Sequence, residues 1–376
     1  MAHNNPFIYG NPVAPEQLIG RDKELRHIAR RIGTGQSTII TGSPRCGKTS
    51  VLDYLSAPEK QVALYGDEAD NLVFSYLGAY ECGPEFSQAQ FWHQVLRPLQ
   101  ERIVAQGTDS PLFKAYQIGE ENHFESYELG KLIAQIKKAN WRLVLLIDEF
   151  DSLLHHPILN SAEFFGGLRT QVSRGKNALV LVITANISRS QFHEKTQRLN
   201  PMGSPYFNFT EEVVLGALPD TEIDKLLHQG DAYFTDEDRS FLKEVAGGHP
   251  YLLKVAASNL WAEYEHGNEK KPIKRQQRVR QLIFDKFKEY SLQKEKSDII
   301  VGDDDEMLKN LSNPIFIAFM FVGTLLGERV GYLLTNKSFL FEAEPLSIHV
   351  FKFGCAALGA FLGYKIAKLK LFKFNG

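Results

Sequence analysis

Cysteine is scarce in this sequence, and charges of the two signs nearly balance. The 376 residues include only three scattered cysteines, Cys46, Cys82 and Cys355, whose spacing matches neither a metal-binding motif nor a disulfide framework. The formal net charge of −2 gives no general argument for nucleic-acid binding. The N-terminus has neither a basic region nor an apolar core, so the sequence predicts no secretory signal. Cys46 lies inside the glycine-rich loop described below, where oxidation would be harmful, so we expect the chain to work in a reducing cytosol.

Internal repeats and low-complexity tracts are also missing. A hydrophobic content of 43% and a charged content of 23% are typical of globular proteins with sizeable cores. The length fits more than one domain. We expect an α/β core at residues 1–217, a helical lid and linker at 218–300, and a hydrophobic helical hairpin at 301–376.

The clearest motif spans Gly42 to Thr49 and reads GSPRCGKT, which matches the phosphate-binding pattern G-x-x-x-x-G-K-T. A β-branched run at 37–41 predicts a strand before it, and the residues after it favour a helix. Lys48 would reach the β- and γ-phosphates of ATP, and the Thr49 hydroxyl would bind Mg²⁺. The alternative is a chance glycine turn. The predicted nucleotide-binding residues of the loop are Gly42, Ser43, Pro44, Arg45, Cys46, Gly47, Lys48, Thr49 and Ser50.

An uninterrupted apolar run at 142–147 (RLVLLI) predicts a strand that is buried on both faces, as in a parallel sheet. Asp148, Glu149 and Asp151 follow it, at the strand end where open α/β sheets bind ligands. We expect Asp148 to bind Mg²⁺ and Glu149 to polarise the attacking water as a general base. Asp151 is predicted to cap a helix or to support its neighbours. The alternative interpretation of Asp148 and Glu149 is that they form an ordinary helix N-cap.

Weaker patterns predict the remaining elements. Strands are expected at 72–77, 178–184 and 207–216, and helices at 23–31, 89–103, 127–139, from 218 onwards and on either side of residues 247–250. Residues 105–125 are rich in turn formers, which predicts a loop. The basic stretch at 270–280 predicts a linker or an exposed helix between domains. The fold class is therefore α/β, with a five-stranded parallel sheet and a helical lid.

Two further segments resemble those of a known family. LIGRDKELRHI at 18–28 is similar to the box before the phosphate loop of STAND and Cdc6-like AAA+ ATPases, and GGHPYLLKVAA at 247–257 is similar to their lid segment. Without this resemblance they would be a surface helix after a turn and a common helix linker. The residues that the resemblance implies are Ile19, Gly20 and Arg21 against the adenine, and His249 and Pro250 on the opposite side of the nucleotide.

The same resemblance implies roles for two more groups of residues. In these families a polar residue after the strand at 178–184 contacts the γ-phosphate or the water, and Asn186 fits this role, with Thr184 as the second choice. Arginines from one subunit also reach the nucleotide of another. The candidates for such an arginine finger are Arg169, Arg174, Arg189 and Arg198, and the sequence does not choose among them.

The C-terminal part of the chain is much more apolar. Segments 314–334 and 346–367 each approach the length of about twenty residues that a helical membrane crossing needs. Charged residues such as Glu328 and Lys352 interrupt them, but glycines spaced four residues apart around Gly327 allow close helix packing in lipid. Lysines follow the second segment. We expect a transmembrane hairpin with both ends cytoplasmic, and the alternative is a buried hairpin that completes a soluble core.

The motifs and the resemblance together imply an ATPase of the prokaryotic STAND type that uses ATP and Mg²⁺. Such ATPases use nucleotide state to switch between monomer and homo-oligomer, several of them in anti-phage defence. We therefore expect a cytoplasmic ATPase domain held at the inner membrane through 314–367, with a separate sensor or effector protein as partner because no sensing array is evident. One alternative is a soluble Cdc6-like ATPase acting on nucleic acid, supported only by the stretch at 270–280. The other is a membrane-tethered scaffold without catalysis, against which Glu149 argues.

Overall fold

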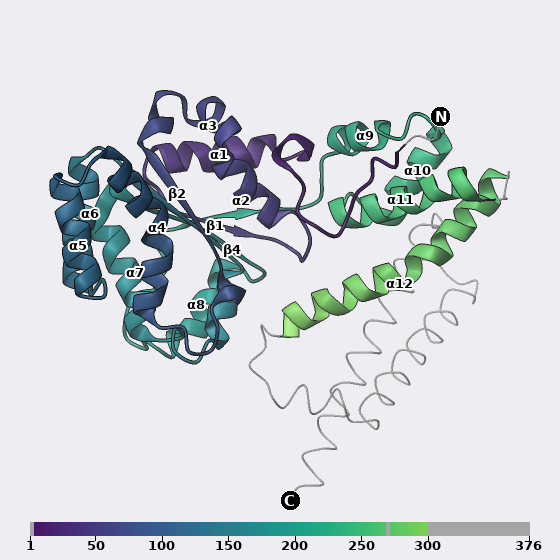
Figure 1. Cartoon of the computed structure of the whole chain (residues 1–376). Helices are drawn as coiled ribbons and strands as arrows, with labels where there is room; N and C mark the ends of the chain where they lie inside the picture. The colour runs from purple at the N-terminus through teal and green to yellow at the C-terminus, as the bar shows by residue number, and fades with distance from the viewer. Residues whose placement is uncertain (1–3, 268–270, 300–376) are drawn as a thin grey trace, which may run out of the picture. The chain divides into compact units, whose positions relative to one another are not determined.

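Five parallel strands form the sheet at the centre of the computed structural model (Figure 1). The structure describes residues 4–267 and 271–299. The strand order is β2-β3-β4-β1-β5, and every pair of neighbours is parallel. The strands are β1 (Thr38–Thr41), β2 (Leu72–Gly78), β3 (Arg142–Asp148), β4 (Leu179–Ala185) and β5 (Glu211–Val214). This arrangement confirms the predicted five-stranded parallel sheet.

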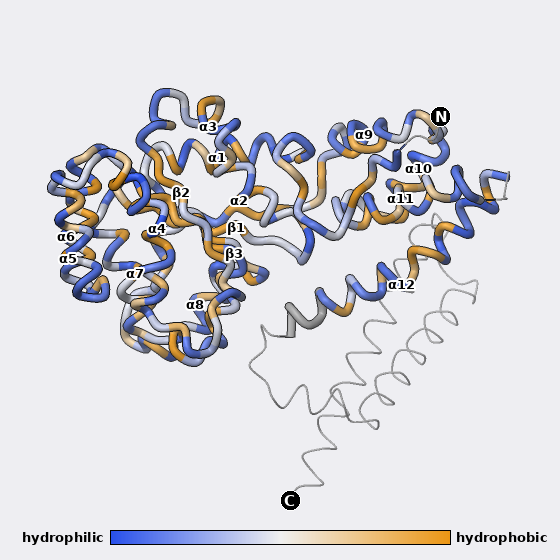
Figure 2. Tube along the Cα trace, in the orientation of Figure 1, coloured by the Kyte–Doolittle hydropathy of each residue, from blue (hydrophilic) through white to orange (hydrophobic). Residues whose placement is uncertain are grey.

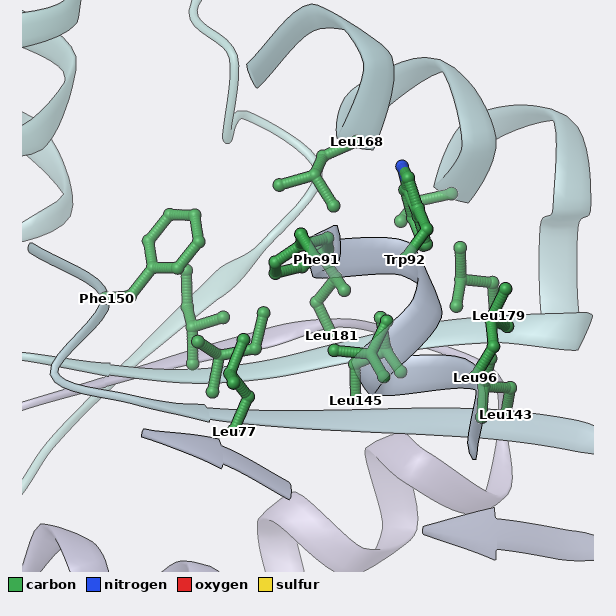
Figure 3. Packing of buried hydrophobic residues seen from close by; sticks show 14 of the residues in the cluster. Leu77, Phe91, Trp92, Leu96, Leu143, Leu145, Phe150, Leu168, Leu179 and Leu181 are labelled. Carbon is green, nitrogen blue, oxygen red and sulfur yellow. The ribbon is translucent and has the colours of Figure 1, made fainter. Parts of the chain in front are cut away.

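The central strands are apolar throughout because helices cover both faces of the sheet. In β3, Leu143 and Leu145 face one layer of helices, whereas Val144 and Leu146 face the other. Figure 3 shows the first of these layers, where Leu143 and Leu145 lie below Phe91 and Trp92 of helix α4. Burying one such leucine contributes about 1.5–3 kcal/mol of transfer free energy, so the two cores account for much of the sheet's stability.

Eight α-helices flank the sheet in the described part of the chain up to residue 200. One face is covered by α1 (Asp22–Gly33), α2 (Lys48–Ser56) and α3 (Pro58–Tyr65). The other face is covered by α4 (Gln88–Gln106), α5 (Pro111–Glu121), α6 (Ser126–Lys138), α7 (Ala162–Gly175) and α8 (Arg189–Gln197). Short 3₁₀ helices lie between these elements at η1 (Pro15–Gln17), η2 (Gly66–Asn71), η3 (Ala79–Glu81), η4 (Phe150–His155) and η5 (Lys176–Ala178). Local sequence sets several boundaries: Ser87 and Gln90 form a capping box at the start of α4.

Four helices form a second core that follows the sheet in sequence, and we call this bundle the lid. They are α9 (Asp220–His228), α10 (Asp236–Ala246), α11 (Pro250–His266) and α12 (Pro272–Ile299). Gly247 ends α10 with a left-handed φ of 57°, and Pro250 begins α11, so the Gly-Gly-His-Pro segment is a tight turn between two helices. Phe7, from the N-terminal arm, is buried in the same core. In Figure 2 the apolar stretches of these helices alternate with hydrophilic ones, as expected of an amphipathic bundle.

Two predicted elements need correction. Residues 105–125 are not a loop, because Ser110 caps α5 and Pro111 occupies its first turn. The last strand covers only Glu211–Val214 rather than 207–216. For the basic stretch at 270–280, the sequence left a linker or an exposed helix open. The described part of it opens helix α12, and most of its side chains are exposed, while Val279 is buried in the lid core.

The described residues belong to one compact unit that ends at Val301. None of their helices is long and apolar enough to cross a membrane. The two segments for which the sequence predicts a membrane hairpin, 314–334 and 346–367, lie outside the described residues. The hairpin and the domain boundaries therefore stay predictions.

Candidate functional site

The GSPRCGKT segment forms a loop between β1 and the start of α2. The loop needs its first glycine because a Cβ at Gly42 would lie 2.7 Å from both the Sγ of Cys46 and the carbonyl oxygen of Leu215. Gly47 has a φ of 100° at the N-cap of α2, a conformation that side chains rarely adopt. The loop therefore delivers the chain into a helix whose N-terminus faces the loop, which is the arrangement that binds phosphate.

Lys48 is held at the mouth of this loop. Its ammonium nitrogen donates hydrogen bonds to the carbonyl oxygens of Gly42 at 2.9 Å and Ser43 at 3.2 Å, and to Oδ1 of Asn186 at 2.9 Å. The residue is buried, with 8% of its surface exposed. These neutral acceptors orient the cation without cancelling its charge, so the charge remains available to an anion.

Asp148, at the end of β3, is oriented by three hydroxyl groups. Thr49 Oγ1 donates to Asp148 Oδ2 at 2.6 Å, and the Tyr76 hydroxyl donates to the same oxygen at 3.2 Å. Thr184 Oγ1, from β4, donates a short hydrogen bond to Oδ1. The Thr49 hydroxyl and the Asp148 carboxylate, which contact each other, are oxygen ligands of the type that Mg²⁺ prefers. Among the described residues, no group of three or more His, Cys, Asp or Glu side chains could hold a metal alone, so a cation here would also need phosphate oxygens or water.

Glu149 has an unusual backbone conformation and an altered acidity. Its φ of 53° is left-handed, which is uncommon for a residue with a side chain and is typical of functional positions. Its N–H donates to Thr184 Oγ1 at 2.8 Å. Partial burial raises the pKa of its carboxyl, and the nearby carboxylates of Asp148 and Asp151 raise it further, although Lys48 opposes them. A carboxyl of raised pKa beside the phosphate loop is suited to accept a proton from water.

Asn186 and Thr184 lie at different depths. Asn186 contacts Lys48 and faces the cavity described below, whereas Thr184 is completely buried beneath it. The backbone N–H of Asn186 donates to Asp151 Oδ2 at 3.1 Å. Asp151 therefore positions the segment after β4. It lies within the 3₁₀ helix η4 and does not cap it. Of the two residues considered from the sequence, Asn186 is the one placed to meet a ligand.

The four candidate finger arginines are away from this site. Arg169 donates to the carbonyl oxygen of Ser204 at 3.0 Å, and Arg189 donates to that of Thr210 at 2.5 Å. None of the four lines the cavity within the described residues. The structure of one chain therefore does not choose among Arg169, Arg174, Arg189 and Arg198.

The box before the phosphate loop packs behind that loop. Arg21 is buried and donates to the carbonyl oxygens of Cys46 at 3.1 Å and Gly216 at 2.8 Å, so it ties the loop to the chain that leads into the lid. Gly20 has a φ of 77°, and a Cβ there would lie 2.8 Å from Leu218. Ile19 and Arg21 line the cavity, whereas Gly20 fixes the turn between them.

The lid contacts the phosphate loop directly. His249 Nε2 lies 3.2 Å from Ser43 Oγ, and the Arg45 guanidinium lies 4.5 Å from the centre of the Tyr251 ring. Sequence reasoning placed His249 and Pro250 beside the nucleotide but missed Tyr251 and Lys254 of the same helix. Lys254 lines the cavity, and burial lowers the pKa of its ammonium group. The spacing of Lys254, four residues and thus one helical turn after Pro250, could have indicated it.

A cavity of about 670 Å³ joins these groups, and this volume is in the range of small-molecule sites. The predicted residues that line it are Ile19, Arg21, Pro44, Arg45, Cys46, Gly47, Lys48, Thr49, Ser50, Asp148, Glu149, Asn186 and Pro250. Gly20, Gly42, Ser43 and His249 are not among the lining residues. The N-terminal arm at 8–13, which sequence reasoning did not assign, closes another side, and its Val13 N–H donates to Ser50 Oγ at 3.0 Å.

Residues 30–190 match the model of the AAA domain family. This match includes the phosphate loop and strands β1 to β4, so this part of the chain is similar to AAA domains. A comparison with curated proteins found no match. The structure is similar to that of a Walker-type ATPase of Pyrococcus abyssi, with 14% identity, a TM-score of 0.51 and 92% of each chain covered. It is also similar to the ORC2 protein of Aeropyrum pernix in ADPNP-ADP complexes, with 15% identity, a TM-score of 0.52, and 98% of this chain and 99% of that chain covered. At these identities the likeness shows a shared fold.

Proposed function

We propose that this chain is a Mg²⁺-dependent ATPase that works as a nucleotide-controlled switch, and that its lid responds to the nucleotide. One observation carries the proposal. Lys48, the Thr49–Asp148 pair and Glu149 meet at the carboxyl ends of β1 and β3, at the entrance of one cavity. A phosphate cation, a metal-ligand pair and a base are the groups that nucleoside triphosphate hydrolysis needs.

Each group has a separate task in this proposal. The loop N–H groups and Lys48 bind and orient the phosphates, and Asn186 holds the Lys48 ammonium towards them. Thr49 and Asp148 would hold Mg²⁺, which when bound supplies charge neutralisation on the phosphates. Glu149 orients a water molecule and accepts its proton, for which its raised pKa is suited.

The test measures nucleotide binding and turnover separately. Lys48→Ala should abolish ATP binding, and Lys137→Ala, a change of an exposed lysine on α6, is the matched control. Glu149→Gln should bind ATP like the parent protein and hydrolyse it about 10²–10⁴ times more slowly, the range for a lost general base. Parent-like turnover in Glu149→Gln would refute the assignment of the base.

We further propose that the switch is of the STAND type and that it controls self-assembly of a membrane-active module at 314–367, in a role such as anti-phage defence. The support is the sequence: two apolar segments, closely spaced glycines and a lysine-rich end. Fractionation of cells that express the full chain tests it. Gly327→Leu should then block close packing and any membrane damage while ATP hydrolysis continues. A full chain that never sediments with membranes would contradict this part alone.

Nucleic acid is the weaker candidate as a target. The likeness to the ORC2 fold motivates it, but the basic stretch that supported it from the sequence is engaged within the lid. Arg275 stacks on Tyr264, Arg278 pairs with Glu263 at 3.1 Å, and Arg280 pairs with Glu244 at 2.8 Å. DNA affinity that falls steeply with salt would support this candidate, and its absence would remove it.

A further inference from the structure

The C-terminal half of helix α12 contacts the phosphate loop. It packs along α11 (Figure 1). Its Glu289 Oε1 lies 3.8 Å from Nη2 of Arg45. The ring of the next residue, Tyr290, lies 4.7 Å from the His249 ring. The last described helix is thus tied to the loop that binds phosphate, across more than two hundred positions of sequence.

Arg45 can contact both a ligand in the cavity and Glu289 of α12. Its backbone is left-handed, with a φ of 59°, and its side chain lines the cavity together with Tyr251. Glu289 is not among the residues that line the cavity. The guanidinium therefore reaches from inside the nucleotide site to an acid outside it, with the Tyr251 ring as its support.

Arg45 can pair with Glu289 or with the phosphates of a nucleotide, and the relative strength of these two interactions determines which pair forms. The Arg45 and Glu289 side chains are 34% and 48% exposed, and an ion pair in such surroundings is weak because water screens it. A polyphosphate carries more negative charge than one carboxylate and accepts two parallel hydrogen bonds from a guanidinium. The same polyphosphate would also repel the Glu289 carboxylate, since like charges at short range disfavour each other.

We propose that Arg45 is an exchangeable tie between nucleotide and α12. Without nucleotide it holds α12 through Glu289. A nucleoside triphosphate in the cavity binds Arg45 in place of Glu289, so α12 loses this ion pair with the phosphate loop and its attachment there becomes weaker. The inference rests on the proposed function, because it needs a nucleotide in this cavity. It supplies a route from the site to the residues that follow α12, since the chain continues from Ile299 into the C-terminal segment.

Linkage gives the tie a second, reciprocal consequence. If nucleotide weakens the contact between Arg45 and Glu289, then that contact weakens nucleotide binding by the same factor. Glu289→Gln keeps the length and helical preference of the side chain but removes its charge. It should therefore raise nucleotide affinity about two- to fivefold, the factor that an exposed ion pair is worth. This change is a cleaner test than a substitution of Arg45, because the left-handed backbone at Arg45 would be disturbed as well.

The experiment is hydrogen–deuterium exchange on the full chain, following backbone amides at 285–293 with and without ADPNP and Mg²⁺. In the parent protein ADPNP should increase exchange there. In Glu289→Gln, exchange should already be high without ADPNP and should change little on its addition. Lys286→Gln is the matched control, because it removes the other partner of Glu289, which lies 3.5 Å away on the same helix, and leaves Arg45 in place.

Calorimetry of ADPNP binding separates the two possible failures. If ADPNP does not bind the parent protein, the proposed function fails and the exchangeable tie fails with it. If ADPNP binds but exchange at 285–293 stays constant or decreases, only the tie is overturned. Parent-like exchange and parent-like affinity in Glu289→Gln would overturn it as well, whereas parent-like behaviour of Lys286→Gln supports it.

Discussion

Thr49 Oγ1 donates a hydrogen bond of 2.6 Å to Asp148 Oδ2, which joins the first turn of α2 to the end of β3. The second carboxylate oxygen, Oδ1, accepts from Thr184 Oγ1 on β4. Asp148 is thus fixed from two sides by hydroxyl groups that come from neighbouring parts of the same sheet edge. The carboxylate is oriented before any cation binds, so little ordering has to occur at that moment.

Thr184→Val tests this orientation. Valine has nearly the shape of threonine but no hydroxyl, so Asp148 Oδ1 would lose a donor and the Glu149 N–H would lose its acceptor, while the shape of the side chain on β4 is kept. Loss of a residue that orients a metal ligand lowers metal affinity about 10–100-fold. We expect the Mg²⁺ concentration that half-saturates ATP hydrolysis to rise by that factor. Asn186→Ala, which leaves Asp148 untouched, should instead lower turnover at saturating Mg²⁺, and equal effects on both quantities would contradict the separate roles.

Glu149 should set the acidic limb of the pH profile of turnover. A general base must be deprotonated, and burial with two neighbouring carboxylates raises the pKa of Glu149 above its ordinary value of 4.5. Activity is then lost as pH falls through this raised pKa, at a pH above 4.5. In Glu149→Gln the residual activity should lack this limb. Asp151→Asn is the control, because the pKa of Asp151 is raised too and its own titration could otherwise produce the same limb.

The same shift makes a prediction about stability. A carboxyl whose pKa is raised on folding prefers to be protonated in the folded state, so it disfavours folding at any pH above that folded pKa. Glu149→Gln removes this charge and should therefore unfold at a higher temperature than the parent protein at neutral pH, despite its lower turnover. Below the unfolded-state pKa the difference should vanish. A lower midpoint at neutral pH would contradict the electrostatic account.

The sequence was most informative where one strand or loop carries its own chemistry. The apolar run at 142–147 and the phosphate loop each predict a local structure without help from distant residues, and both are found in the structure. Residues 105–125 show the limit of this reasoning. Gly107 and Ser110 are loop formers, yet Ser110 is also a good helix cap, and only the apolar surface offered by α4 and α6 lets α5 form behind it.

Contacts between segments that are distant in the sequence could not be predicted from the sequence. The basic residues at the start of α12 predict an exposed stretch, and the burial of Val279 depends on packing against the other lid helices, which a single sequence does not reveal. The position of the N-terminal arm could not be predicted either, because Asn5 contacts Ser258, 253 positions away. This contact helps to place the arm where residues 8–13 line the cavity. Local propensity carries no information on such pairs.

His249 links the lid to the phosphate loop. His249→Ala tests whether this contact affects nucleotide binding. The change removes the interaction with Ser43 Oγ at the back of the phosphate loop. We expect altered ATP affinity with an unchanged thermal midpoint. The control is His228→Ala, a change of an exposed histidine on α9. Unchanged affinity together with a lower midpoint would instead support the simpler role of His249 as part of a helix linker.

Phe7 should anchor the arm that closes the cavity. It is buried in the lid, where its ring stacks on Phe234 at 5.3 Å between centroids and meets the edge of Trp261 at 6.2 Å. Truncating a buried phenylalanine costs about 3–5 kcal/mol when the site cannot collapse. Phe7→Ala should therefore lower the denaturant midpoint of the lid and free the arm from it. The measurement is tryptophan fluorescence in a Trp92→Phe, Trp141→Phe background, in which Trp261 is the one tryptophan left. Ile8→Ala is the stability control, because that side chain is 62% exposed and its loss should change the free energy of unfolding by less than about 0.5 kcal/mol. If the two variants unfold alike, the arm is not held by Phe7, and its position beside the cavity must depend on the Val13–Ser50 contact instead.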